Sequence, residues 1–152
     1  MGRKHLCIIH QCDPDIRSVS KMLQNLREGD EVILAGICDA REEELLSRQM
    51  SDRSFVGLKL REEITAFTCE LAEETTQSLL ETATGMCEAQ GYSPQVLSRN
   101  GGFLELIHHL ASDCEPATIF MPRLEQGLFS KLWRGNRTDA VVSSLRYPVV
   151  VC

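Results

Sequence analysis

The segment Glu31–Cys38 reads EVILAGIC, and every residue after the first is apolar or glycine. Strands that face water on one side alternate apolar with polar residues, whereas strands buried on both faces form continuous apolar runs. The Gly29-Asp30 pair before the segment is typical of a turn. The segment therefore predicts a strand inside a parallel sheet whose two faces are covered by helices.

A second apolar run, Leu6–Ile9, precedes this segment and also has the length of a strand. Asp13 is expected to cap a helix that begins at Pro14, and Asp15 complements the dipole of that helix. Strand, helix and strand would form a parallel unit with a right-handed crossover. The apolar residues of the helix recur at helical spacing, at Ile16, Val19, Met22, Leu23 and Leu26.

The chain continues as an alternation of helices and strands. Residues 39–55 are polar and are interpreted as a surface excursion, and a long helix is expected over Leu60–Ala89, ending at Gly91. The buried stripe of this helix is predicted to be Ile64, Phe67, Leu71, Leu79 and Met86.

A weak strand is expected at Gln95–Leu97, and the last two strands at Thr118–Met121 and Pro148–Cys152. The sequence thus predicts a single α/β domain over residues 1–152, with an open, Rossmann-like sheet of five mostly parallel strands and helices on both faces. The helix before the fourth strand is marked by Phe103, Leu104, Leu106, Ile107, Leu110 and Ala111.

Composition excludes several classes of protein. The formal net charge of -6 argues against nucleic acid as the main partner, because that binding depends on neutralising phosphates. No apolar run approaches the roughly 20 residues that span a bilayer, and the N-terminus lacks the apolar stretch of a signal peptide. We therefore expect a cytoplasmic protein with no membrane partner.

Seven cysteines, an odd number with no CxxC pair, favour packed, reduced thiols over a disulfide framework or a zinc site. His10 and Cys12 follow the first strand, where a Cys/His nucleophile is conceivable, but a packing role is favoured because no orienting group is evident. The neighbouring His108 and His109 point about 100° apart on a helix and so rarely share a metal ion. No metal site is expected.

The stretch Ala117–Cys152 runs strand, loop, helix and strand. Ligands of parallel sheets sit beyond the carboxyl ends of the strands, where loops meet helix N-termini. The loop Arg123–Arg137 is thus the first place to look for a binding site, with Asn136 able to cap the helix after Gly135. His10, Asp13 and Cys38 end or follow the first two strands and would face the same cleft.

This stretch resembles the universal stress protein family. Thr118–Met121 matches the family's fourth strand, Gly135-Asn136 its Gly-Ser pair at a helix start, and Pro148–Val151 its closing Pro-Val and apolar strand. The resemblance implies a strand order of 3-2-1-4-5, homodimers formed through the last strand and, in many members, ATP binding. The interface residues would be Val149, Val150 and Val151, which form an apolar sheet edge that native proteins avoid or pair.

ATP-binding members of the family carry glycines spaced G-x2-G-x9-G, which project here onto Pro122, Glu125 and Gly135. Proline has no N–H to offer a phosphate. A carboxylate about 4 Å from a phosphate charge opposes binding by about 4 kcal/mol at an effective dielectric constant near 20. The resemblance and these losses together predict a dimeric, non-enzymatic regulatory or stress-response module whose ATP binding is lost or altered.

An alternative remains open, in which the protein binds ATP or another adenine nucleotide and hydrolyses it weakly or not at all. A rearranged loop would then hold the nucleotide, or another small anion, through basic and flexible residues. The candidate residues are His10, Asp13, Cys38, Arg123, Gly127, Gly135, Asn136 and Arg137. A third class, the adenine nucleotide α-hydrolase-like enzymes, is disfavoured because residues 10–14 lack that group's Ser- and Gly-rich loop.

Overall fold

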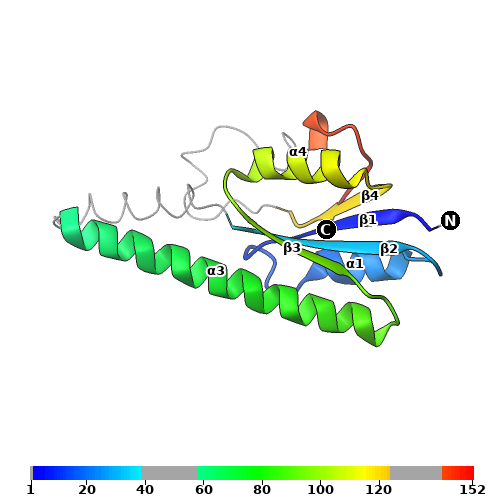
Figure 1. The fold of residues 1–152 in the computed structure, drawn as a ribbon, viewed down its shortest axis with the longest axis horizontal. Helices are drawn as coiled ribbons and strands as arrows, with labels where there is room; N and C mark the ends of the chain where they lie inside the picture. Colours follow the sequence, from blue (N-terminus) through cyan, green and yellow to red (C-terminus); the bar gives the residue numbers. More distant parts are fainter. Residues whose placement is uncertain (1, 39–57, 124–141) are drawn as a thin grey trace.

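The computed structural model describes residues 2–38, 58–123 and 142–152. The predicted surface excursion at 39–55 and the site residues Gly127, Gly135, Asn136 and Arg137 lie outside the described part. Figure 1 shows the described elements, which are β1 (Lys4–Ile9), α1 (Arg17–Asn25), β2 (Glu31–Cys38), α3 (Leu58–Ala89), β3 (Gln95–Asn100), α4 (Phe103–Cys114), β4 (Thr118–Met121) and β5 (Val149–Val151).

The strands form one sheet in the order β3-β2-β1-β4-β5, and every neighbouring pair is parallel. The predicted fold class and strand order are confirmed. β1 lies at the centre and pairs with β2 on one side and β4 on the other, so the direction of winding reverses between β1 and β4. Ligands of such sheets bind at this reversal point, outside the carboxyl ends of the strands.

Helices cover both faces of the sheet, with α4 on one face and α1 and α3 on the other (Figure 1). Alternate residues of each strand divide between two cores, as the two-residue period of a strand requires. Leu6 and Ile8 of β1 belong to the core under α4, whereas Cys7 and Ile9 belong to the core under α1 and α3. β2 is buried from Val32 to Cys38, which confirms the interpretation of its continuous apolar run.

The predicted buried stripe of α3 is wrong in its N-terminal half. Phe67 is 66% exposed and Leu71 is 52% exposed, while Leu79 and Met86 are half-buried and the Ile64 side chain lies outside the described part. The stripe that contacts the sheet consists mostly of smaller residues and is formed by Ala72, Thr76, Leu80, Ala83 and Cys87.

Gly36 has no side chain, and this leaves room for Leu80 and Thr76 of α3 to pack against β2. A Cβ atom at Gly36 would lie 2.6 Å from Leu80 Cδ1, closer than side chains tolerate. In α4, Phe103, Ile107, Leu110 and Ala111 are buried as predicted, but Leu104 is exposed. The weakly predicted strand near residue 95 is longer than expected, because Gln95–Asn100 pairs with β2 along its whole length.

Asp30 links the chain segments at the amino ends of β1 and β2, and its side chain is 4% exposed. Its Oδ1 accepts a hydrogen bond from the Arg3 N–H at 3.0 Å. Its Oδ2 accepts one from the Arg27 N–H at 3.0 Å and lies 3.1 Å from Nε2 of the buried His5. Burial alone would raise the pKa of Asp30, but these hydrogen bonds outweigh it and lower the pKa to about 2.

Candidate functional site

The described candidate residues meet at one edge of the sheet. His10 and Asp13 follow β1, Cys38 ends β2, and Arg123 follows β4 by two residues. Because all the strands are parallel, these four residues share the carboxyl edge, as expected for a ligand site. The other four candidate residues lie outside the described part, so their positions stay predictions.

A pocket of about 280 Å³ opens at this edge, beside the reversal point between β1 and β4. Asp13 and Arg123 line the pocket, whereas His10 and Cys38 do not. Its other walls, which were not among the predicted binding residues, come from the loop after β1, from Pro122 and from the end of β5. The complete lining is Cys12, Asp13, Pro14, Asp15, Arg17, Pro122, Arg123 and Cys152.

Asp13 caps α1 in a different way from the one predicted. Its Oδ1 accepts a hydrogen bond from the Arg17 N–H at 3.0 Å, and its Oδ2 accepts bonds from the Ser18 N–H and hydroxyl at 3.1 and 3.0 Å. The carboxylate therefore occupies the first amides of the helix, where an external anion would otherwise bind.

The expectation that α1 begins at Pro14 is wrong, because the helix starts at Arg17 after a left-handed Ile16 with φ 51° and ψ 48°. Turn bonds from the Asp13 N–H to His10 O and from the Ile16 N–H to Asp13 O fold the intervening loop. Ile16 is buried in the core under α1, and this burial offsets the strain of a β-branched residue in the left-handed region. Asp15 is exposed and lies 3.8 Å from the equally exposed Arg17 side chain.

His10 is packed rather than displayed. Its ring is 5% exposed and meets the ring of Phe103 edge-on, with the centroids 5.4 Å apart. Its Nδ1 accepts a hydrogen bond from the Cys12 N–H at 3.1 Å, so in the neutral ring the proton is on Nε2. The Cys12 thiol lies 4.0 Å from the carbonyl oxygen of Arg123. These contacts agree with the packing role that the sequence favoured for His10.

The loop after β4 starts without an N–H group that points into the pocket. Pro122 has no N–H, and the N–H of Arg123 donates to the Cys152 carbonyl oxygen at 3.1 Å. The Cys152 N–H in turn donates to Met121 O at 3.0 Å, so the β4–β5 ladder extends past both strand ends. Phosphate loops depend on exposed backbone N–H groups, and the two described residues of this loop provide none.

Comparison of the structure with solved proteins identifies the fold. The hypothetical protein MJ0577 superposes with a TM-score of 0.71 at 20% identity, over 99% of this chain and 95% of that one. The universal stress protein UspA from Lactobacillus plantarum superposes with a TM-score of 0.67 at 10% identity, over 99% and 98%. The chain has the fold of the universal stress proteins.

A third protein with this fold is a universal stress protein in complex with cAMP, with a TM-score of 0.59 at 10% identity, over 99% of this chain and 96% of that one. The sequence by itself matches no family model and has no significant match among curated proteins. The likeness to universal stress proteins thus extends over nearly the whole chain in backbone course, while few residues are shared.

The universal stress protein fold of this chain carries packed thiols. Burial raises the pKa of Cys7 far above that of a free thiol and raises that of Cys87 to about 11. Burial also raises the pKa of Cys114 and Cys152, which therefore stay protonated at neutral pH. In the described part of the chain, Cys7, Cys87, Cys114 and Cys152 are free thiols.

Searches for metal sites and membrane-spanning helices cover the described ranges 2–38, 58–123 and 142–152. No group of three or more His, Cys, Asp or Glu side chains in them has an arrangement that could hold a metal ion. The helices in these ranges include none that is both long enough and apolar enough to cross a membrane. His108, on α4, contacts the last described segment of the chain: its Nε2 lies 2.9 Å from Oγ of Ser144.

Proposed function

We propose that this protein is a dimeric regulatory or stress-response module with the universal stress protein fold, in which ATP binding is lost or altered. The backbone likeness to universal stress proteins supports the first part. One observation carries the second part: the N–H of Arg123 is bonded to the Cys152 carbonyl oxygen directly after Pro122. The start of the loop after β4 is therefore hydrogen-bonded into the sheet.

Two features of the pocket support the same proposal. The Asp13 carboxylate is 8% exposed and occupies the first amides of α1, so a phosphate would have to displace a buried negative charge. The pocket also carries a second carboxylate, because Asp15 lines it together with Asp13.

Calorimetry with ATP and Mg²⁺ at moderate salt tests the loss of nucleotide binding. We expect no binding tighter than about 1 mM, because Pro122 and Arg123, the described start of the loop, offer a triphosphate no free N–H group. An affinity below that value would favour the alternative, a nucleotide-binding stress protein that hydrolyses ATP weakly or not at all. The universal stress protein with cAMP is the reason to include cAMP in the same titrations.

The dimer is proposed to form through β5, which is an edge of the sheet. The bonds of Pro148 and Cys152 to β4 fix the alternation along β5, so the N–H and C=O groups of Val149 and Val151 point outward. A twofold axis at Val150 would pair these groups with their copies in antiparallel fashion. Such pairing would give hydrogen-bond partners to the outward N–H and C=O groups of this edge strand.

We expect Val151→Pro to convert the dimer into a monomer of 17.1 kDa, measured by light scattering at micromolar concentration. Proline removes an N–H that faces outward and leaves the hydrogen bonds to β4 in place. Val151→Thr is the matched control, because it keeps the shape and the N–H, and it should stay dimeric. A monomeric wild-type protein would contradict the proposed dimer.

A further inference from the structure

The opposite edge of the sheet is a second open strand. Within the described part of the chain, β3 pairs only with β2. The Gly101 N–H donates to Cys38 O, so by alternation the main-chain groups of Val96, Ser98 and Asn100 point away from β2. β3 has six residues, which is twice the length of β5, and all but one are exposed. An edge of this length is a template for another strand.

A groove runs beside this edge, between β3 and α3. Leu97 packs toward α4, so Val96, Ser98 and Asn100 lie on the face of the sheet that α3 covers. The groove has a volume of about 460 Å³, and its α3 wall carries three carboxylates. Its lining includes Ser98, Asn100, Glu73, Glu74 and Glu81.

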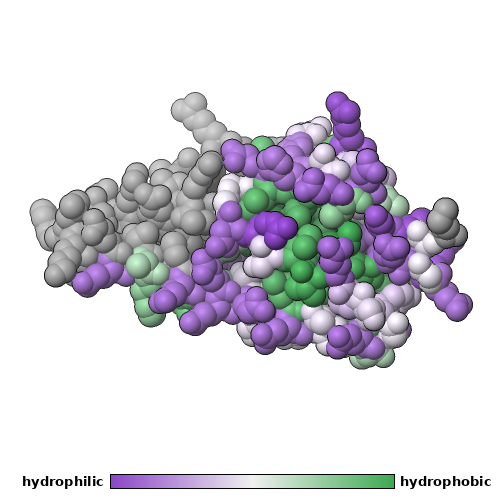
Figure 2. Space-filling view, viewed as in Figure 1, coloured by the Kyte–Doolittle hydropathy of each residue, from purple (hydrophilic) through white to green (hydrophobic). Residues whose placement is uncertain are grey.

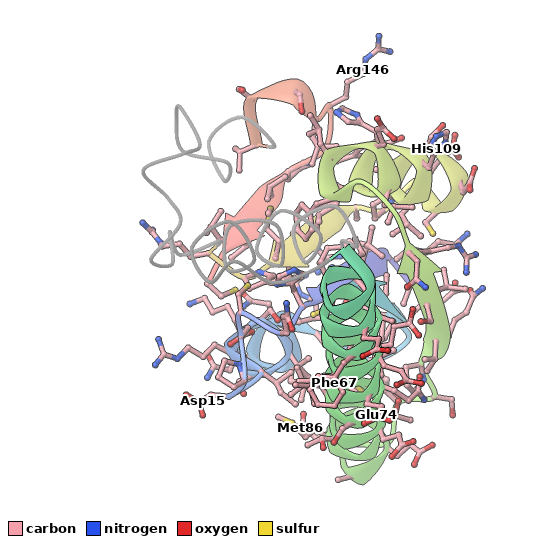
Figure 3. The ribbon with its side chains drawn as sticks, turned by 90° about the vertical axis from the view of Figure 1, so that its left-hand side faces the viewer. Asp15, Phe67, Glu74, Met86, His109 and Arg146 are labelled. Carbon is pink, nitrogen blue, oxygen red and sulfur yellow. The ribbon has the colours of Figure 1, made fainter. Side chains whose placement is uncertain are left out.

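The edge also offers an apolar contact. Val96 is 44% exposed, on the same face of β3 as the groove. Figure 2 shows apolar atoms at the middle of this side of the molecule, between α4 and α3, with hydrophilic atoms around them. Glu74, which is labelled on α3 in Figure 3, is exposed and lines the groove, so its carboxylate is reached from solvent. Backbone groups, an apolar site and acidic side chains thus lie together.

We propose that an extended segment of a partner protein, with basic side chains at alternate positions, adds to the sheet along β3. Its main chain would bond to the outward groups of Val96, Ser98 and Asn100, as in strand addition elsewhere. Alternate side chains of an added strand lie over one face of the sheet, here above the groove. Lysine or arginine at those positions would complement the three glutamates.

Contacts already present at the edge make this docking selective. The Arg99 guanidinium donates from Nη1 to the Ser98 carbonyl oxygen at 2.9 Å, and Asn100 Nδ2 donates to Glu73 Oε1 at 2.9 Å. Any docking strand has to displace the Arg99 side chain from the Ser98 carbonyl oxygen, which costs free energy, and an uncharged strand gains nothing in return from the carboxylates. A basic strand regains free energy from the carboxylates of α3. The proposal goes beyond the regulatory module proposed above and does not depend on nucleotide binding or on the β5 dimer.

The test uses a short fluorescent peptide of alternating lysine and valine, with a glutamate–valine peptide as the charge control, measured by anisotropy at several salt concentrations. We expect the lysine peptide to bind, and its affinity to fall as the salt concentration rises.

Ser98→Pro removes an outward N–H and should weaken peptide binding about tenfold or more. Ser98→Ala keeps that N–H and should change the affinity by less than about twofold. Joint Glu74→Gln and Glu81→Gln substitution should weaken it several-fold.

Methylating the backbone nitrogens of the lysine peptide gives a second measurement that does not depend on how Ser98→Pro folds. We expect this peptide to bind wild-type protein about tenfold more weakly or worse. Equal binding of the methylated and unmethylated peptides, equal binding of the two charge types, or no binding up to about 1 mM would overturn the proposal. Peptide-free association that Ser98→Pro abolishes would assign the edge to a second copy and would also overturn it.

Discussion

Asp30→Asn is expected to lower the free energy of unfolding by about 3 kcal/mol. The carboxylate of Asp30 accepts hydrogen bonds from the Arg3 and Arg27 N–H groups and lies 3.1 Å from His5 Nε2. An asparagine would turn an NH₂ group toward at least one of these donors, leaving a donor facing a donor in a site that is 4% exposed. Chemical denaturation of both proteins at neutral pH measures the difference.

The stability difference between wild type and Asp30→Asn should depend on pH in a defined direction. The pKa of Asp30 falls from 3.8 in the unfolded chain to about 2 in the folded protein, so the folded state favours the ionised form. The resulting stabilisation, about 2 kcal/mol, is fully present above pH 4 and is lost as the pH falls toward 2. The gap between wild type and Asp30→Asn should therefore narrow over that window.

Glu28→Gln is the control for Asp30→Asn, because Glu28 is exposed in the same turn and should change stability by less than about 0.5 kcal/mol. Equal effects of the two substitutions, or a gap that stays constant down to pH 2, would show that Asp30 does not fasten this edge.

Asp13→Ala is expected to lower the free energy of unfolding by about 3 kcal/mol. The substitution leaves the N–H groups of Arg17 and Ser18 without their acceptor at a buried helix end. The Ser18 hydroxyl can still turn to Ile8 O, which lies 3.4 Å away, so the loss is confined to the two amides. Thermal and denaturant unfolding measure it.

Asp15→Ala provides the matched control two residues along the chain. Asp15 and Arg17 are both about three-quarters exposed and 3.8 Å apart, a pair that contributes little. We expect this variant to stay within about 0.5 kcal/mol of wild type. A loss as large as that of Asp13→Ala would mean that charge near the start of α1, and not the capping carboxylate, stabilises the helix.

The sheet could be predicted from the sequence. The unbroken apolar run of Glu31–Cys38 requires cover on both faces, and the structure buries seven of its eight residues. The resemblance to universal stress proteins in the last third implied the strand order, which the strand pairing confirms. Such runs are predictable because burial on both faces permits few polar residues.

The faces of α3 were harder to predict. Phe67 and Leu71 are large and regularly spaced, so they suggested a buried stripe, yet both are exposed. The true contact stripe contains alanine, threonine and cysteine beside Leu80, which packs over the bare backbone of Gly36 in β2. A pattern that weighs large apolar residues does not detect a stripe made mostly of small ones.

The candidate site was predictable in place but not in detail. Asp13 and Arg123 were expected at the carboxyl edge, and both line the pocket. The left-handed turn at Ile16 moves the helix start, and the Asp13 carboxylate bonds amides four and five residues along the chain, those of Arg17 and Ser18. The bond from the Arg123 N–H to Cys152 O depends on the register of β4 with β5, which no local sequence pattern specifies.

The Arg123 amide proton, followed by NMR during titration with ATP and Mg²⁺, tests most directly whether the loop after β4 is closed to phosphate. We expect this proton to be protected from exchange by the Cys152 carbonyl oxygen, and its resonance to stay in place up to about 1 mM nucleotide. A saturable shift of the Arg123 amide at lower nucleotide concentrations, with loss of its protection, would contradict the proposed loss of ATP binding.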